Sequence, residues 1–169
     1  VKEMILNNIN CPLSSAAGRL FDAVSALIGI CPVTSFDSEA PMRLESAINS
    51  ETDFYYPFTV GESIVFEETF KAIMADMLHT DKPVIAVKFH NTIVQAILEV
   101  SEVIRNETSI EKVVLSGGVF QNKYLLEKTI QKLTKKMFKV YTNNQVPVND
   151  GGISLGQLVV ASKKSGSCA

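Results

Sequence analysis

The sequence predicts an α/β fold whose C-terminal third forms a parallel sheet with its crossover helices. Of the 169 residues, 46% are hydrophobic and 20% are charged, so a packed core is available and intrinsic disorder is excluded. Residues 112–116 form a short apolar run of the kind found in buried parallel strands. A strand–helix–strand–helix pattern begins at that run, and this order is typical of parallel sheets.

The first two thirds of the chain predict helices joined by a polar and aromatic connector. In the first helix, serines offer N-caps and Gly29 offers a C-cap, while Pro41 suits the first turn of the second. Pro57 excludes a central strand, so residues 54–58 are expected to form at most an extended edge segment. The expected helices are 14–29, 41–48, 67–78 and 84–105, and the connector is 50–63.

The C-terminal third is expected to form two strands, each followed by a helix. The strands are 112–116 and 137–142, and the helices are 122–136 and 151–162, the latter apolar and largely buried. We therefore expect one partial domain: a helical insertion and connector over 1–65, helices with the strand–helix core over 66–162, and a frayed tail over 163–169. Because Val1 opens the chain in the manner of mid-domain sequence, an incomplete polypeptide is expected.

Charge and cysteine content exclude several classes of protein. Sixteen basic and eighteen acidic residues give a net charge of −2, which does not favour a nucleic-acid or membrane-surface binder. No apolar run is long enough to span a bilayer, and no signal peptide is evident. Three widely spaced cysteines and two histidines fit neither a disulfide framework nor a histidine-rich metal cage, so a reducing cytoplasm is expected. A solvated helix face explains the cluster Lys128, Lys132, Lys135, Lys136 and Lys139.

Ser116, Gly117 and Gly118 stand at the end of the first predicted strand and ahead of a helix. Glycines there let backbone N–H groups approach a phosphate closely, and a helix N-terminus favours an anion. The alternative is a tight turn that needs glycine only for a positive φ, and spacing alone favours this alternative. Asn122 fits equally well as the N-cap of the next helix.

Asp150 follows the second predicted strand and precedes a second glycine pair. Parallel strands joined by a right-handed crossover end at one sheet edge, so Gly117, Gly118 and Asp150 are expected to converge on a crevice where such sheets bind ligands. A carboxylate beside a phosphate site makes sense chiefly when a cation lies between them. The alternative is that Asp150 caps the final helix, but the convergence favours the functional interpretation.

Gly18, Arg19 and Asp22 share the first predicted helix. Arg19 and Asp22 have the spacing of an ordinary surface ion pair. The functional interpretation is that Gly18 admits a ligand and that Asp22 binds hydroxyl groups such as those of a ribose. On the long helix, His90 flanks the apolar stripe, where a hydrogen-bonded packing role is favoured over a ligand role.

Four segments occur in an order that is familiar from one enzyme family. They are residues 15–24, 88–92, 114–122 and 149–157, and they include the stretches L-S-G-G-V-F-Q-N and N-D-G-G-I-S-L-G-Q. Together they resemble the C-terminal part of the HypF carbamoyltransferases, from about residue 11 to residue 161. Shorter versions of these stretches occur in tRNA threonylcarbamoyladenosine transferases and antibiotic O-carbamoyltransferases.

The resemblance implies the second half of an actin/sugar-kinase/Hsp70-like domain, which is RNase H-like, with a helical insertion at its N-terminal end. Its family hydrolyses carbamoyl phosphate, forms carbamoyl-adenylate with ATP, and transfers the carbamoyl group to the C-terminal cysteine of HypE in nickel–iron hydrogenase maturation. The implied ligands are ATP or carbamoyl-adenylate and one divalent metal, iron or zinc. The implied partners are HypE and the missing N-terminal half of the same domain, with no membrane or nucleic acid, in the cytoplasm.

Matching the family motifs residue by residue implies binding roles for six positions, while the catalytic residues stay unknown. Phosphate contacts are expected for Gly117, Gly118 and Asn122, nucleoside contacts for Gly18 and Asp22, and metal binding for Asp150, with the other metal ligands outside this chain.

The sequence departs from the family in two places. Residues 36–42 replace the family's Y-E-G-Q-A-A-M with F-D-S-E-A-P-M, which removes a glycine and adds charge. The family's H-x-x-x-H helix, which binds metal, is absent, so the fragment alone is expected to be inactive. Two alternatives to a HypF-type enzyme stay open: a tRNA threonylcarbamoyl transferase relative, and a nucleotide-binding module of the same fold without catalysis.

Overall fold

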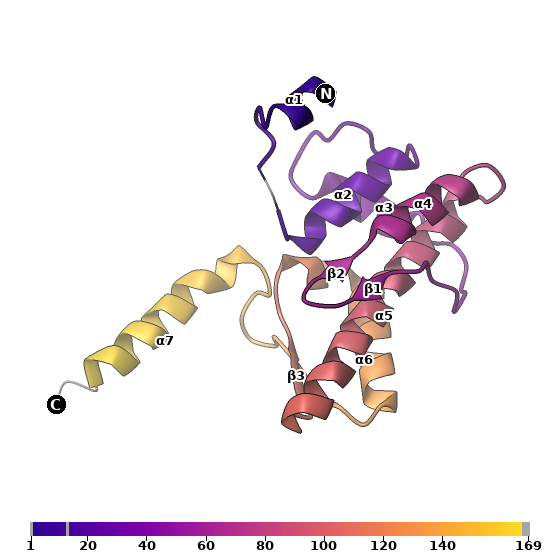
Figure 1. The fold of residues 1–169 in the computed structure, drawn as a ribbon. Helices are drawn as coiled ribbons and strands as arrows, with labels where there is room; N and C mark the ends of the chain where they lie inside the picture. The colour runs from indigo at the N-terminus through magenta and orange to yellow at the C-terminus, as the bar shows by residue number, and fades with distance from the viewer. Residues whose placement is uncertain (1, 13, 167–169) are drawn as a thin grey trace.

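The structure, a computed structural model, describes residues 2–12 and 14–166 as seven α-helices, two short 3-10 helices and two pairs of strands (Figure 1). In chain order the elements are α1 (Lys2–Leu6), α2 (Ala17–Leu27), α3 (Glu39–Ser46), β1 (Thr59–Val60), β2 (Ile64–Val65), α4 (Glu67–Asp76), α5 (Lys82–Thr108), β3 (Lys112–Leu115), η1 (Gly118–Gln121), α6 (Lys123–Lys135), β4 (Lys139–Thr142), η2 (Asp150–Gly152) and α7 (Ile153–Gly166). No helix among these described residues is both long and apolar enough to cross a membrane.

Helix α5 is the centre of the core. It presents buried side chains on several faces between Ile85 and Leu98, because the other helices surround it. The main cluster draws its members from α2, α3, α4, α5, α6 and the connector: Phe21, Val24, Ile28, Leu44, Tyr56, Ile73, Ile85, Ala86, Phe89, Ile93, Val94 and Leu125. Burial of this apolar surface is the main favourable contribution to folding.

The parallel strand pair predicted for the C-terminal third is confirmed. β3 and β4 pair in parallel, with Lys112 opposite Lys139 and Leu115 opposite Thr142. A second cluster of Leu98, Leu115, Leu133 and Phe138 joins this small sheet to α5 and α6. β4 begins two residues later than expected, because Met137 adopts a left-handed φ of 66° in the turn after α6.

Several predictions for the N-terminal two thirds were wrong in detail. Residues 54–58 form no strand, which is compatible with the expectation of at most an extended edge segment, but the short antiparallel hairpin of β1 and β2 just beyond them was not predicted. The connector follows α5 because its backbone is fixed there: the Tyr56 N–H donates to Thr92 Oγ1 at 2.8 Å. Helix α2 begins at Ala17 rather than at the serines, and its N-cap, Ala16, makes no side-chain cap bond. Helix α1 was not predicted at all.

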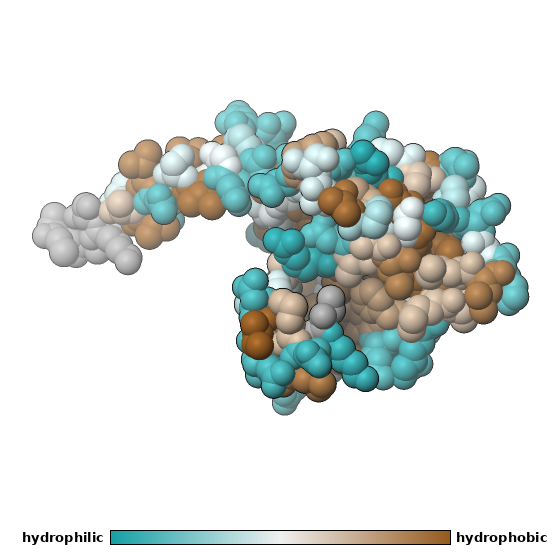
Figure 2. All heavy atoms as spheres, turned by 90° about the horizontal axis from the view of Figure 1, so that it is seen from above, coloured by the Kyte–Doolittle hydropathy of each residue, from teal (hydrophilic) through white to brown (hydrophobic). Residues whose placement is uncertain are grey.

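Helix α7 is exposed, so the expectation of a buried final helix was wrong. It extends away from the α5 and α6 layer (Figure 1). In Figure 2 it forms a projecting arm, on which hydrophobic residues, drawn in brown, lie at the surface. The exposed apolar side chains of α7 are Ile153, Leu155, Leu158, Val159 and Val160. The helix also continues to Gly166, so residues 163–166 are helical rather than frayed, and residues 167–169 lie outside the described residues.

Leu125 tests whether α6 is fastened to the core as described. Leu125 is fully buried in the main cluster, whereas Leu78 is 76% exposed after α4. Leu125→Ala is therefore expected to lower the free energy of unfolding by about 3 kcal/mol, because it leaves a cavity, and Leu78→Ala by less than about 0.5 kcal/mol. Urea denaturation of the two variants measures the difference, and equal losses would contradict this packing.

Candidate functional site

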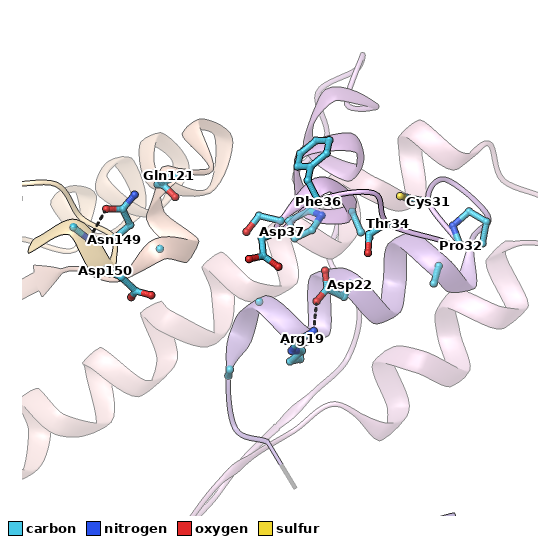
Figure 3. A pocket seen from close by; sticks show the side chains of 18 residues that line it. Arg19, Asp22, Cys31, Pro32, Thr34, Phe36, Asp37, Gln121, Asn149 and Asp150 are labelled. Atoms are coloured by element: carbon cyan, nitrogen blue, oxygen red, sulfur yellow. Dashed lines mark hydrogen bonds and ion pairs between the residues drawn. The ribbon is translucent and has the colours of Figure 1, made fainter. Parts of the chain in front are cut away.

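A polar cleft of about 720 Å³ lies between two groups of residues that are far apart in the sequence. One wall comes from α2 and the segment after it, and the other comes from η1 and the loop before α7 (Figure 3). Four of the six predicted site residues line this cleft: Gly18, Asp22, Gly118 and Asp150. Of the three residues predicted to converge on one crevice, Gly118 and Asp150 line this cleft and Gly117 does not, and α2 supplies the facing wall.

Gly18 and Gly118 leave space in the cleft that the protein itself does not fill. A Cβ atom built on either residue has no other heavy atom within 4 Å, and neither residue has a positive φ. Gly117 and Gly152 differ, because Gly117 has a φ of 107° and a Cβ on Gly152 would lie 2.7 Å from the Pro147 carbonyl oxygen. Glycine in a helix costs up to about 1 kcal/mol relative to alanine. The fold therefore explains Gly117 and Gly152 but not the two glycines of the cleft.

A smaller chamber of about 320 Å³ adjoins the cleft and places Asn122. Gly18, Phe21, Gly118 and Asn122 all line it. Asn122 is the N-cap of α6, since its Oδ1 accepts from the Leu125 N–H at 2.8 Å. Its Nδ2 lies 2.9 Å from His90 Nε2, so both polar atoms of the amide are engaged inside the protein.

The two acidic residues predicted for the site differ in their partners. Asp22 accepts from Arg19 at 3.2 Å, as in the ordinary ion-pair interpretation. The Asp150 side chain makes no hydrogen bond or ion pair to any described residue, and Figure 3 shows it across the cleft from Asp22. The alternative in which Asp150 caps the final helix is not supported, because its side chain makes no cap bond. The neighbouring Asn149 is the N-cap of η2, directly before α7, and accepts from the Gly151 N–H at 3.1 Å.

The described residues offer at most part of the metal site that the resemblance implies. Within residues 2–12 and 14–166, no group of three or more histidine, cysteine, aspartate and glutamate side chains is placed to hold a metal ion. Asp150 offers one carboxylate toward the cleft. The described residues alone therefore do not form a metal site.

His90 is a buried packing histidine, as favoured from the sequence. Its Nδ1 lies 2.8 Å from the Ala86 carbonyl oxygen, which fixes the proton on Nδ1 and leaves Nε2 to accept from Asn122. The ring meets Phe21 and Tyr124 edge-on, at centroid distances of 5.1 and 5.5 Å. Burial lowers the pKa of His90 from 6.5 to about 4, so the ring is neutral near pH 7.

The divergent segment 36–42 lines one end of the cleft. Ser38 has a left-handed φ of 65°, and Glu39 is buried with its carboxylate turned inward. The Glu39 carboxylate accepts from the Ser35 N–H and pairs with Arg43 at 2.6 Å, and these contacts hold its pKa below the usual value. Asp37, in contrast, lies at the cleft (Figure 3).

The lining residues that sequence reasoning did not assign to the site include Phe36, Asp37, Gln121 and Asn149. For Phe36 and Asp37 the available signal was the departure from the family motif. Gln121 and Asn149 stand inside the quoted motifs, next to residues that were assigned.

Comparisons with known proteins agree on one family. Residues 1–157 match the family described as "Carbamoyltransferase, Kae1-like Domain, second subdomain". Carbamoyltransferase HypF of a Synechocystis species is 38% identical over 154 residues, which cover 88% of this chain and 19% of that protein. The crystal structure of a full-length HypF in the phosphate- and nucleotide-bound form superposes with a TM-score of 0.91 at 44% identity, covering 95% of this chain and 26% of that chain.

A more distant relative, a tRNA N6-adenosine threonylcarbamoyltransferase of Thermosipho africanus, is 26% identical over 133 residues, or 73% of this chain and 39% of that protein. The chain thus spans about a fifth of the length of the curated HypF relatives that it matches.

The low pKa of His90 predicts a loss of stability in acid. Between pH 6.5 and about 4 the unfolded chain binds a proton at this position and the folded chain does not, so the free energy of unfolding falls as the pH is lowered. The full effect is about 3 kcal/mol. Because carboxylates also titrate in acid, the measurement compares urea denaturation of the unsubstituted chain with that of His90→Gln. A smaller pH dependence is expected for His90→Gln, and an identical dependence would refute the assignment.

Proposed function

The chain belongs to the HypF carbamoyltransferase family, and from that membership we propose that it forms the nucleotide-binding part of a larger carbamoyltransferase. The whole protein would transfer a carbamoyl group from carbamoyl-adenylate to the C-terminal cysteine of HypE in nickel–iron hydrogenase maturation. In that step the cysteine sulfur bonds to the carbamoyl carbon, the bond from that carbon to the AMP phosphate oxygen breaks, and AMP leaves. No residue of this chain is assigned to the bond-making itself.

The observation that carries the proposal is the pair of glycines that face one cleft without being needed by the fold. Space at Gly18 and Gly118 is of use only if another molecule, or another part of the protein, approaches the backbone there. A nucleotide fits this requirement, because backbone N–H groups bared by glycine bind phosphate oxygens. A 44% identical HypF has been solved in a phosphate- and nucleotide-bound form, which supports the same ligand class here.

The remaining roles follow from the positions of the side chains around the cleft. Gly118 would contact phosphates, while Gly18 and Asp22 would line the nucleoside end. Gly117 does not line the cleft, so its part in the phosphate site would be to form the turn that presents Gly118. Asn122 would contribute to the phosphate end; its side-chain amide is already bonded within the protein, so any direct contact with phosphate requires it to rearrange. Asp150 would supply one ligand to a divalent iron or zinc ion, whose positive charge would offset that of the phosphates.

The exposed apolar side chains of α7 support a missing half of the domain as a partner. Large apolar patches on a soluble protein mark surfaces that another element covers. We propose the N-terminal half of the same actin-like domain as that cover, which makes this chain the second half of an RNase H-like fold. The matching family is itself described as a second subdomain.

A tRNA-modifying role remains the second candidate. The similarity to a tRNA N6-adenosine threonylcarbamoyltransferase supports it, at lower identity than the HypF matches. The tRNA-modifying role would be favoured if the purified full-length protein transferred threonylcarbamoyl groups to tRNA but did not carbamoylate HypE. A nucleotide-binding module without catalysis would show neither activity.

Gly118→Val in the full-length protein tests the nucleotide cleft. The valine side chain enters open space in the fold, so the melting temperature is expected to change little, while the affinity for ATP falls by about tenfold or more. Isothermal titration calorimetry measures the affinity. Gly61→Val is the matched control, because Gly61 is exposed in the β1–β2 turn, away from the cleft. Unchanged ATP affinity in Gly118→Val would refute the proposal.

Asp150→Asn tests the proposed metal ligand. Since Asn149 and not Asp150 caps η2, this substitution is expected to leave the melting temperature unchanged. Elemental analysis of the purified full-length protein should then show less than about a tenth of the metal content, because an amide is a poor substitute for an anionic ligand. Asp81→Asn, at an exposed position before α5 without a cap bond, is the control. Full metal content in Asp150→Asn would remove Asp150 from the ligand set.

A further inference from the structure

We propose that His90 is a positioning residue of the nucleotide cleft, which holds the glycine turn before α6 at a fixed place relative to α2. The inference rests on the proposed function, because the cleft that His90 shapes is the one assigned to the nucleotide. His90 itself does not line the cleft. It acts through two neighbours, one on each wall.

On the α6 side, His90 reaches the glycine turn through Asn122. Between Leu115 and Leu125, Asn122 is the one fully buried residue, so it is the inner anchor of an otherwise accessible segment. The Asn122 N–H also donates to the Val119 carbonyl oxygen at 3.2 Å, which closes η1 on the anchor. The position of Gly118 at the cleft therefore depends on where the Asn122 side chain is held.

On the α2 side, the His90 and Phe21 rings pack in a T-shaped arrangement with their centroids 5.1 Å apart. Phe21 follows Gly18 by three residues, so both lie on one face of α2, and both line the smaller chamber. Phe21 also packs on Phe89 at a centroid distance of 5.1 Å, which fixes its ring. One imidazole thus connects the wall that carries Gly18 with the wall that carries Gly118.

A neutral histidine satisfies both contacts at once. The ring packs against Phe21 in a T-shaped contact. Its unprotonated Nε2 accepts from Asn122, because the Nδ1 proton is directed at the Ala86 carbonyl oxygen. Phenylalanine would keep the ring and remove the acceptor. Glutamine would keep an acceptor oxygen and remove the ring.

Variants at His90 are expected to stay folded, because a second set of bonds fastens α6. The Tyr124 N–H donates to Glu45 Oε1 at 3.1 Å, and the Tyr124 hydroxyl donates to Asn91 Oδ1 at 2.9 Å. These bonds act on Tyr124, in the first turn of α6, and do not involve Asn122. Loss of the His90 contact should therefore loosen the glycine turn without releasing the helix.

The experiment measures both the mobility of the turn and its consequence, in the full-length protein. Hydrogen exchange of the peptide covering residues 116–124 is compared in the unsubstituted protein, His90→Phe and His90→Gln, and ATP affinity is measured by calorimetry. His90→Phe leaves the Asn122 amide donor unpaired, so about tenfold faster exchange and about tenfold weaker ATP binding are expected. His90→Gln is expected to keep both values within about threefold, by the same hydrogen-bond reasoning.

Two further variants separate positioning from general loss of stability. Asn122→Ser keeps an N-cap but removes the donor to His90, so hydrogen exchange of residues 116–124 in the double variant with His90→Phe should be no faster than in His90→Phe alone. Thr92→Val removes a buried hydrogen bond elsewhere on α5 and should leave ATP affinity unchanged. Equal exchange and affinity in His90→Phe and the unsubstituted protein would overturn the inference, as would additive increases in the exchange rate in the double variant. Failure of the unsubstituted protein to bind ATP would instead overturn the proposed function, while the exchange data would still decide the positioning role.

Discussion

The side chain of Asn122 connects the glycine turn at the cleft to helices α5 and α6. Its oxygen caps α6 and its amide nitrogen donates to His90, so one buried residue ties the end of the glycine turn, the start of a helix and the central helix α5 together. A buried amide is tolerated only when its polar atoms are paired, and here both are. The cap fixes where α6 begins, and the bond to His90 fixes where that beginning lies in the core.

The glycines next to Asn122 have two different roles. Gly117 turns the chain after β3 with a φ that favours glycine, and Gly118 then starts η1 beside open space. The parallel pairing of β3 and β4 brings the loop before α7 to the same side, with Asn149 capping and Asp150 left unpaired at the cleft. Structural and functional demands thus fall on neighbouring residues: Gly117 and Asn149 serve the fold, while Gly118 and Asp150 are available to a ligand.

Local sequence signals predicted the elements that have a local cause. The apolar run before Gly117 predicted β3, and the periodic pattern after it predicted α6 as the crossover helix of a parallel strand pair. Asn122 was recognised as a possible cap. The facing wall was identified from the residues only as an alternative at Gly18 and Asp22, because nothing in the spacing of α2 reveals that Phe21 packs against His90. The burial of α7 was mispredicted for a related reason. Apolar residues such as Leu155 and Leu158 show that a helix needs a cover, but they do not show that the cover is provided by the described residues.

The central claim is that a nucleotide lies between Gly18 and Gly118, and a structure of the full-length protein with a non-hydrolysable ATP analogue tests it most directly. The account predicts phosphate oxygens within hydrogen-bonding distance of the backbone at Gly118 and the ribose at the Asp22 end of the cleft. It also predicts that the Asn122 side chain still bonds to His90. An analogue bound outside this cleft, with the space beside Gly18 and Gly118 filled by another segment of the protein, would contradict the account.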